Sequence, residues 1–117
     1  MEKTVHWLLE VSVNEGKLED FKTLMGEMVA ATQAEPGTLI YEWYFDESQQ
    51  TCQINERYQD SSATMVHLQS FAGFADRFMA AVTPVNFIVM GAPDESVREG
   101  LAGLSPTYLR QEAGFSR

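Results

Sequence analysis

The composition of the chain limits its size class and its partners. It has 117 residues, 44% of them hydrophobic, with 8 Lys and Arg against 17 Asp and Glu, for a formal net charge of −9 at pH 7. This length predicts one small globular domain. The negative charge would repel nucleic acid and an anionic membrane surface, so we expect neither as a partner. No apolar run approaches the roughly 18 to 20 residues of a membrane span, and no signal core precedes the patterned sequence, so we expect a cytoplasmic protein.

Cysteine and histidine are too few for a disulfide or a recognisable metal site. Cys52 is the only cysteine, so an intrachain disulfide and a thiolate metal cluster are both excluded. The two histidines, His6 and His67, lie far apart, and the scattered acids give no metal-ligand spacing. We therefore expect no metal, and a fold stabilised by its hydrophobic core.

Residues 4–58 have the pattern of a strand, a helix and a hairpin. Apolar side chains occupy every odd position from 5 to 13, an alternation that predicts a strand. Residues 18–34 carry apolar side chains at three- and four-residue spacing, which predicts an amphipathic helix before Pro36 and Gly37. Alternation over residues 38–46 and 51–58 then predicts an antiparallel hairpin.

Residues 60–91 predict a second helical segment and a fourth strand. Asp60 and the two serines after it are favourable helix caps, and apolar side chains follow on one helical face until Pro84. Gly73 lies inside this segment and is expected to kink or divide it. Alternation over residues 85–91 predicts the last strand.

The order strand, helix, strand, strand, helix, strand over residues 1–91 predicts the fold class. It is that of a split βαβ unit, an α+β ferredoxin-like domain with a four-stranded antiparallel sheet and its helices on one face. In this topology the first strand lies between the third and the fourth. Residues 92–117 add a short helix, with Pro93 as its first residue, and a tail. We expect this C-terminal region to pack on the same domain or on a partner subunit.

The sheet face that points away from the helices has a mixed composition, too apolar for open water and too polar for a dry core. Its residues are His6, Leu8, Glu10, Ile40, Glu42, Tyr44, Gln53, Asn55, Arg57, Ile88 and Met90. A second sheet packed on this face would bury such a mixture, so we expect a homodimer. A domain of this length buries only about 65% of its unfolded surface, which also favours burial between subunits.

The helix-facing side of the sheet is rich in aromatic residues. They are Trp7, Tyr41, Trp43, Phe45, Tyr58 and Phe87. Large rings exceed what so short a chain needs for its core, so one interpretation is a cavity for a flat aromatic ligand, with Tyr41, Trp43, Trp7 and Phe87 in its wall. The alternative is an ordinary aromatic core.

Two ionisable residues are expected on the same apolar side. Strand alternation directs Glu56 toward the helices, and His67 lies on the apolar face of the helix that follows. Burial raises the pKa of a carboxyl group and a nearby imidazolium lowers it, so such a pair can form a general base. The alternative is a structural pair that holds the helix on the sheet.

Three stretches of the sequence resemble the antibiotic biosynthesis monooxygenase family. They are Glu35-Pro36-Gly37-Thr38-Leu39-Ile40-Tyr41-Glu42, then Glu56-Arg57-Tyr58-Gln59-Asp60, then His67. In that family an E-P-G-x-L-x-Y stretch opens the second strand, an E-x-W-x-D stretch ends the third, and a histidine follows one helix later. The resemblance covers roughly residues 4–91. The chain departs from the pattern at Tyr58, where the family usually has tryptophan.

This resemblance implies a fold, a chemistry and a set of site residues. Members are dimeric α/β barrels, in which two ferredoxin-like sheets form a shared barrel and each cavity lies between sheet and helices. Characterised members oxidise quinols, anthrones or related aromatics with molecular oxygen and need no flavin or metal. Carried over by position, Glu56, Tyr58 and His67 would be pocket residues and Tyr41 part of the wall. A haem-degrading branch uses a histidine near residues 74–78, where this chain has none.

Two functions follow as hypotheses. The first is a cofactor-independent monooxygenase in which His67 removes a proton from a phenolic or quinol-like substrate, Glu56 orients the imidazole, and the resulting anion reacts with oxygen. The second is a non-catalytic dimeric module that binds a small aromatic metabolite. Both need the same pocket, so the sequence leaves open whether the protein is an enzyme.

Overall fold

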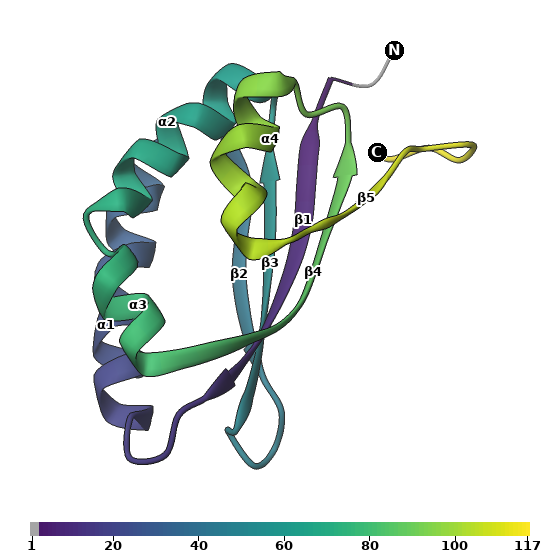
Figure 1. The fold of residues 1–117 in the computed structure, drawn as a ribbon. Coiled ribbons are helices and arrows are strands. Elements are labelled where there is room, and N and C mark those ends of the chain that lie inside the picture. The colour runs from purple at the N-terminus through teal and green to yellow at the C-terminus, as the bar shows by residue number, and fades with distance from the viewer. Residues whose placement is uncertain (1–2) are drawn as a thin grey trace.

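The fold is known from a computed structural model, which describes residues 3–117. Helices cover one face of a twisted sheet, and the other face has no helix over it (Figure 1). The elements, in order, are β1 (Val5–Val13), α1 (Leu18–Gln33), β2 (Thr38–Phe45), β3 (Thr51–Tyr58), α2 (Ser61–Ala72), α3 (Ala75–Ala81), β4 (Val82–Gly91), α4 (Glu95–Leu101), the 3-10 helix η1 (Ala102–Leu104) and β5 (Thr107–Leu109). This is the predicted α+β ferredoxin-like architecture.

The sheet has one strand more than predicted. Its order is β2-β3-β1-β4-β5, and β1 lies between β3 and β4 as expected. The pairs within β1 to β4 are antiparallel, but β5 runs parallel to β4. The sheet is therefore mixed, and the prediction of four antiparallel strands is wrong at this edge. The chain turns after η1 at Ser105, which has a left-handed φ of 50°, and returns along the free edge of β4.

Three predicted boundaries need correction or refinement. The helical segment is divided next to Gly73, into α2 and α3. Strand β4 begins at Val82 and contains Pro84, which lies at an irregularity in the pairing with β1, where a missing N–H is tolerated. Helix α4 begins after Asp94, whose carboxylate accepts a hydrogen bond from the Val97 N–H at 3.0 Å, and Pro93 lies outside it.

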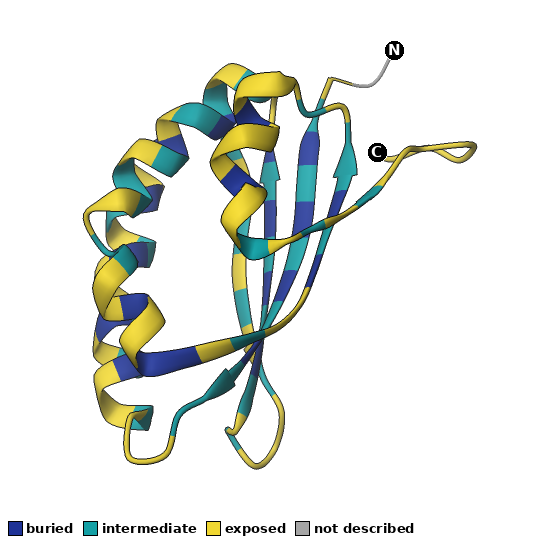
Figure 2. Ribbon diagram, viewed as in Figure 1, coloured by how far each residue is buried: buried dark blue, intermediate teal, exposed yellow. Residues whose placement is uncertain are grey.

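The hydrophobic core lies between the sheet and the helices. Along β1, every second residue is buried, as the banded strand in Figure 2 shows. Phe21, Leu24 and Met28 of α1 face these strands, and Val97 and Leu101 of α4 are buried at one end of the same layer. Helix α4 thus packs on the domain of its own chain, and Leu101 and Leu104 help to enclose the site described below.

The other sheet face has no helix over it, and the C-terminal tail borders it at one end, where Arg57 donates to the Ser116 hydroxyl at 3.4 Å. It contains a polar chain of contacts in which His6 Nε2 lies 2.6 Å from Asn55 Oδ1, and the Asn55 amide donates to Glu42 at 3.2 Å. Apolar side chains, among them Ile40, Ile88 and Met90, are only partly buried there. Over the described residues, no helix is both long and apolar enough to cross a bilayer.

Candidate functional site: a buried Glu-His-Glu cluster

Two neighbouring elements bring Glu56 and His67 together. In β3 every second residue is buried, so Glu56 and Tyr58 both point toward the helices. The chain then enters α2 through Asp60, whose carboxylate accepts from the Ala63 N–H at 2.8 Å and so fixes the start of the helix. His67 lies on the buried face of α2, and its side chain is only 5% exposed.

A third residue, Glu35, reaches the cluster from the turn between α1 and β2. The Glu35 N–H donates to the Thr32 carbonyl at 2.9 Å, and the Glu35 carbonyl accepts from the Thr38 N–H at 3.2 Å. This turn lies directly against the start of α2, because a Cβ at Gly37 would stand 2.5 Å from the Cβ of Ala63. The absence of a side chain at Gly37 therefore lets Glu35 approach His67.

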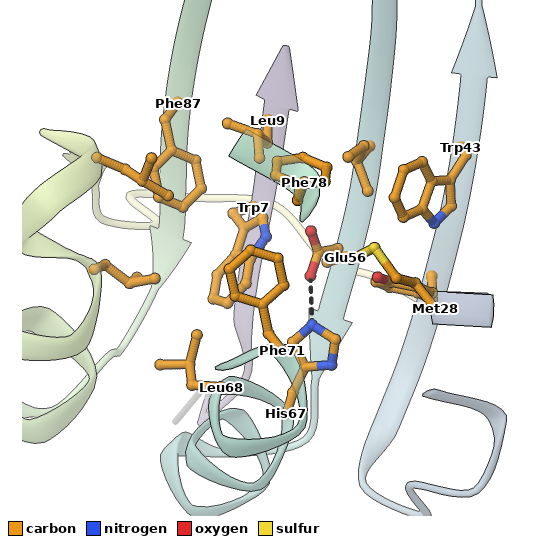
Figure 3. Close-up of a pocket in the computed structure, with 14 residues that line it drawn as sticks. Trp7, Leu9, Met28, Trp43, Glu56, His67, Leu68, Phe71, Phe78 and Phe87 are labelled. Atoms are coloured by element: carbon orange, nitrogen blue, oxygen red, sulfur yellow. Dashed lines mark ion pairs between the residues drawn. The ribbon is translucent and has the colours of Figure 1, made fainter. Parts of the chain in front are cut away.

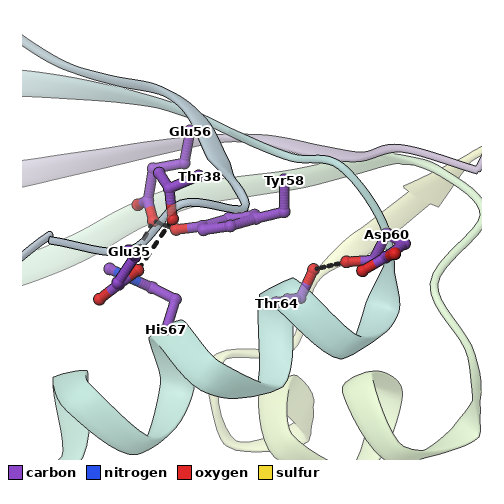
Figure 4. A network of polar contacts seen from close by, with 7 residues as sticks. All are labelled: Glu35, Thr38, Glu56, Tyr58, Asp60, Thr64 and His67. Carbon is purple, nitrogen blue, oxygen red and sulfur yellow. Dashed lines mark hydrogen bonds and ion pairs between the residues drawn. The ribbon is translucent and has the colours of Figure 1, made fainter. Parts of the chain in front are cut away.

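The imidazole of His67 lies between two carboxylates (Figure 4), of which Figure 3 shows Glu56. Its Nδ1 is 3.0 Å from Glu35 Oε1, and its Nε2 is 3.3 Å from Glu56 Oε1. The Tyr58 hydroxyl donates to that same Glu56 oxygen, and the Thr38 hydroxyl donates to Glu35 Oε1 at 2.8 Å. The expected pairing of Glu56 with His67 is thus present, with a second carboxylate on the far side of the ring.

Burial and charge act in opposite directions on His67. Burial lowers the pKa of the imidazole, but hydrogen bonds and Coulomb attraction from Glu56 and Glu35 outweigh it, so the net pKa is raised above its ordinary value. Burial, followed by the negative charge of Glu56, raises the pKa of the Tyr41 and Tyr58 phenols far above the usual range. The two carboxylates therefore favour the imidazolium form of His67, and both phenols are held in their neutral form.

An apolar cavity opens beside this cluster (Figure 3). It is lined by Trp7, Leu9, Met28, Tyr41, Trp43, Ile54, Glu56, His67, Leu68, Phe71, Phe78, Phe87, Leu101 and Leu104. The space between these side chains, mouth included, is about 400 Å³, of which about 40 Å³ is open to the centre of a water molecule. That is room for roughly three waters, so an aromatic ligand would have to displace lining side chains.

Most residues predicted for the site line the cavity, and one lies behind it. Tyr41, Trp43, Trp7 and Phe87 lie in the cavity wall, as do Glu56 and His67. Tyr58 is outside the lining and contacts Glu56 from behind. The indole Nε1 of Trp43 is buried and has no hydrogen-bond partner among the described residues. The wall thus contains one unused donor as well as the ionisable pair.

Sequence reasoning did not assign Glu35 to the site. It follows the last turn of α1 and precedes Pro36, a position with no periodicity from which burial could be inferred. The only available signal was its place at the start of the E-P-G stretch. Residues 3–117 contain no group of three or more His, Cys, Asp or Glu side chains arranged to hold a metal ion.

The chain combines a ferredoxin-like sheet with a buried acid-base cluster between the sheet and the helices. The comparisons with known proteins identify a family with this fold. The family model described as antibiotic biosynthesis monooxygenase matches residues 4–83. The chain therefore belongs to the antibiotic biosynthesis monooxygenase family, as its motifs indicated. A search of curated proteins gave no match.

Several solved structures resemble the chain. MupZ from Pseudomonas fluorescens has a TM-score of 0.86 at 26% identity, over 98% of this chain and 95% of that one. Rv0793 from Mycobacterium tuberculosis has a TM-score of 0.69 at 22% identity, over 80% and 99%. SnoaB from Streptomyces nogalater, described as a cofactor-independent oxygenase, has a TM-score of 0.66 at 16% identity, over 79% and 95%. At such identities the last two establish a shared fold.

Proposed function

We propose that the protein is a cofactor-independent monooxygenase that oxidises a quinol, an anthrone or a similar phenolic aromatic with molecular oxygen. The observation that carries this proposal is the buried Glu35-His67-Glu56 cluster at the wall of an apolar cavity. An acid-base group in a water-poor pocket is suited to removing a proton from a weakly acidic substrate. The description of SnoaB, a protein with the same fold, supports the oxygen-dependent reaction.

The geometry favours Glu56 as the group that accepts the proton. Both ring nitrogens of His67 face carboxylate oxygens, which accept hydrogen bonds. A ring that donates from both nitrogens has no free lone pair to act as a base, and the raised pKa of His67 agrees with this arrangement. Glu56 lines the cavity and is held by Tyr58 and His67. We therefore exchange the roles expected from the sequence, with Glu56 as the base and the His67 imidazolium as the positive charge that stabilises the substrate anion.

The proposed reaction needs no external reductant. Glu56 takes a proton from the substrate, and the electron-rich anion transfers an electron to oxygen and combines with the product of that transfer as a peroxide. In an anthrone, loss of water from the peroxide leaves a carbonyl group, so CH₂ and O₂ give C=O and H₂O. In a quinol the same loss leaves a hydroxyquinone and H₂O. The role of Trp7, Tyr41, Trp43 and Phe87 is to hold the ring of the substrate and exclude water.

We also propose that the protein works as a homodimer that buries the helix-free face of the sheet. The mixture of half-buried apolar side chains and hydrogen-bonded polar ones on that face suits a second copy of the same surface. The cavity lies on the opposite side of the sheet, so each subunit would keep its own site. A cytoplasmic location fits a protein whose oxygen-dependent chemistry needs no disulfide.

The test is oxygen consumption by flavin-free and metal-free protein with a panel of naphthoquinols and anthrones, corrected for autoxidation. We expect uptake of one O₂ for each substrate oxidised. Substrate loss without oxygen uptake would replace the proposal with an acid-base reaction that has no redox step. Ligand binding without turnover would favour the second hypothesis, a dimeric module that binds an aromatic metabolite.

A further inference from the structure

The two oxygens of the Glu35 carboxylate have very different surroundings. Oε1 accepts hydrogen bonds from the Thr38 hydroxyl and from His67 Nδ1. Oε2 is buried and has no hydrogen-bond partner among the described residues. In Figure 4 one Glu35 oxygen lies toward Thr38, and the other points away from it. A buried carboxylate oxygen without a donor costs free energy, so an observed one calls for an explanation.

Glu35 also lies at a different surface from the rest of the cluster. Glu56 and His67 line the apolar cavity, which Glu35 does not reach. Glu35 instead lines a depression of about 580 Å³, mouth included, on the outside of the molecule, together with Val29, Thr32, Gln33, Thr38, Leu39, Ile40 and Tyr41. That depression has room for several water molecules, and its lining offers polar groups to hold them.

The cluster therefore connects two separate spaces. Glu56 faces the cavity, His67 lies in the middle, and Glu35 borders the outer depression, with contacts of 3.3 Å and 3.0 Å between successive residues. Tyr41 is the one residue that lines both spaces. Its strongly raised pKa keeps the phenol neutral, so it separates the two spaces without itself giving up a proton at ordinary pH.

We propose that Glu35 is the route by which the buried cluster exchanges protons with solvent, through the outer depression and not through the substrate cavity. In the releasing step the Nδ1–H bond of His67 breaks and an O–H bond forms on Glu35 Oε1. Rotation of the carboxyl group then turns this O–H toward the outer depression, where the O–H bond breaks and the proton passes to water. His67 is left as the neutral ring with its proton on Nε2. Uptake is the reverse, and each direction moves one proton and no electrons.

This route gives the proposed function proton exchange with solvent, which a dry cavity lacks. Substrate and product can block the apolar side, yet the cluster can still take up or release a proton between turnovers. The groups that face the ring are Glu35, Glu56, Tyr41 and Tyr58. Of these, Glu35 and Tyr41 border the outer depression, and Glu35 is the carboxylate of the two. The inference rests on the proposed function for its purpose, but its test needs no substrate.

The test is the solvent exchange rate of the two ring N–H protons of His67, measured by NMR on the ligand-free protein. We expect the Nδ1–H, which faces Glu35, to exchange with water faster than the Nε2–H, which faces Glu56. In Glu35→Gln, whose amide accepts a hydrogen bond but cannot pass on a proton, Nδ1–H exchange should slow by roughly tenfold or more. Glu35→Asp keeps a carboxylate and should restore much of the rate.

Glu56→Gln is the matched control, because it removes the other carboxylate from the same ring. It should leave Nδ1–H exchange the faster of the two. Equal or faster exchange at Nε2–H in the unmodified protein, or an unchanged Nδ1–H rate in a folded Glu35→Gln, would overturn the inference. Oxygen uptake is measured separately. Failure of the proposed oxidation would therefore leave the N–H exchange rates interpretable, and failure of the exchange test would leave the oxidation untouched.

Discussion

At the scale of single residues, the charge of His67 is the property on which the site depends. Burial alone would favour the neutral ring, and the two carboxylates reverse that preference because each lies within about a hydrogen-bond length of a ring nitrogen. Removing any one member leaves buried charge without a partner, which is costly. The cluster is therefore expected to affect stability as well as chemistry.

The raised pKa of His67 predicts a definite pH dependence of stability. The pKa in the folded protein is above that of an unfolded histidine, about 6.5, so the stabilisation is complete below that pH and is lost as pH rises through the folded pKa. Urea unfolding of the protein and of His67→Gln should therefore differ more at about pH 6 than at about pH 9. A difference in unfolding free energy between the two proteins that grows with pH would contradict a positive charge on His67.

Tyr58 gives a second expectation at this scale. Tyr58→Phe removes the hydroxyl that donates to Glu56 and keeps the ring, which packs 5.0 Å from Trp7 between centroids. Loss of this donor to a buried carboxylate should lower the free energy of unfolding by about 1–3 kcal/mol. Tyr108→Phe is the control, since its ring contact with Arg98 is kept. Equal urea-unfolding midpoints for Tyr58→Phe and Tyr108→Phe would show that the Tyr58 hydroxyl does not stabilise the Glu56 carboxylate.

At the scale of elements, the turn between α1 and β2 positions the second carboxylate. Gly37→Ala would place a methyl group 2.5 Å from the Ala63 Cβ and push the turn away from α2. We expect a loss of about 1–3 kcal/mol in unfolding free energy. Gly26→Ala in α1 meets nothing within 4 Å and should instead stabilise by up to ~1 kcal/mol, through helix propensity. Thermal unfolding of the two glycine variants measures both changes in stability. An unchanged stability in Gly37→Ala would contradict the close approach of the turn to α2.

The elements also explain which features the sequence could predict. Alternation in residues 5–13, 38–45 and 51–58 was sufficient for three strands, and it placed Glu56 on the helix side. The three residues of β5 are too few to show a period, and their pairing depends on a turn at Ser105 that has no glycine to mark it. Glu35 was missed for a similar reason, because a turn residue becomes buried only when α2 packs over it.

At the scale of the whole molecule, the sheet separates two surfaces with different roles. Its helix side holds the cavity and the cluster, and its other side has no helix over it and only the C-terminal tail at one end (Figure 1). The mass of the chain is 13.1 kDa, so the proposed dimer should sediment at about twice that value. Sedimentation of the unmodified protein as a 13.1 kDa species at micromolar concentration would contradict the dimer.

Substitutions on the two outer surfaces should separate their roles. Ile88→Arg puts a charge at the centre of the helix-free face, opposite Leu8 in the pairing of β1 with β4, and should shift the protein to the monomer. Val66→Arg is the control, because Val66 is 53% exposed on α2, away from that face. Sedimentation velocity on both variants should show a monomer for the first and a dimer for the second. A dimer in both cases would place the interface elsewhere.

The most direct test of the account is the rate of oxygen uptake by the flavin-free and metal-free protein beside that of Glu56→Gln, with naphthoquinols and anthrones as substrates. Glu47→Gln, an exposed change in the β2–β3 loop, serves as the control. We expect uptake above autoxidation for the unmodified protein and Glu47→Gln, and a rate about 100-fold lower for Glu56→Gln. Uptake that is equal in all three proteins, or absent from the unmodified protein, would contradict Glu56 as the base of a cofactor-independent oxidation.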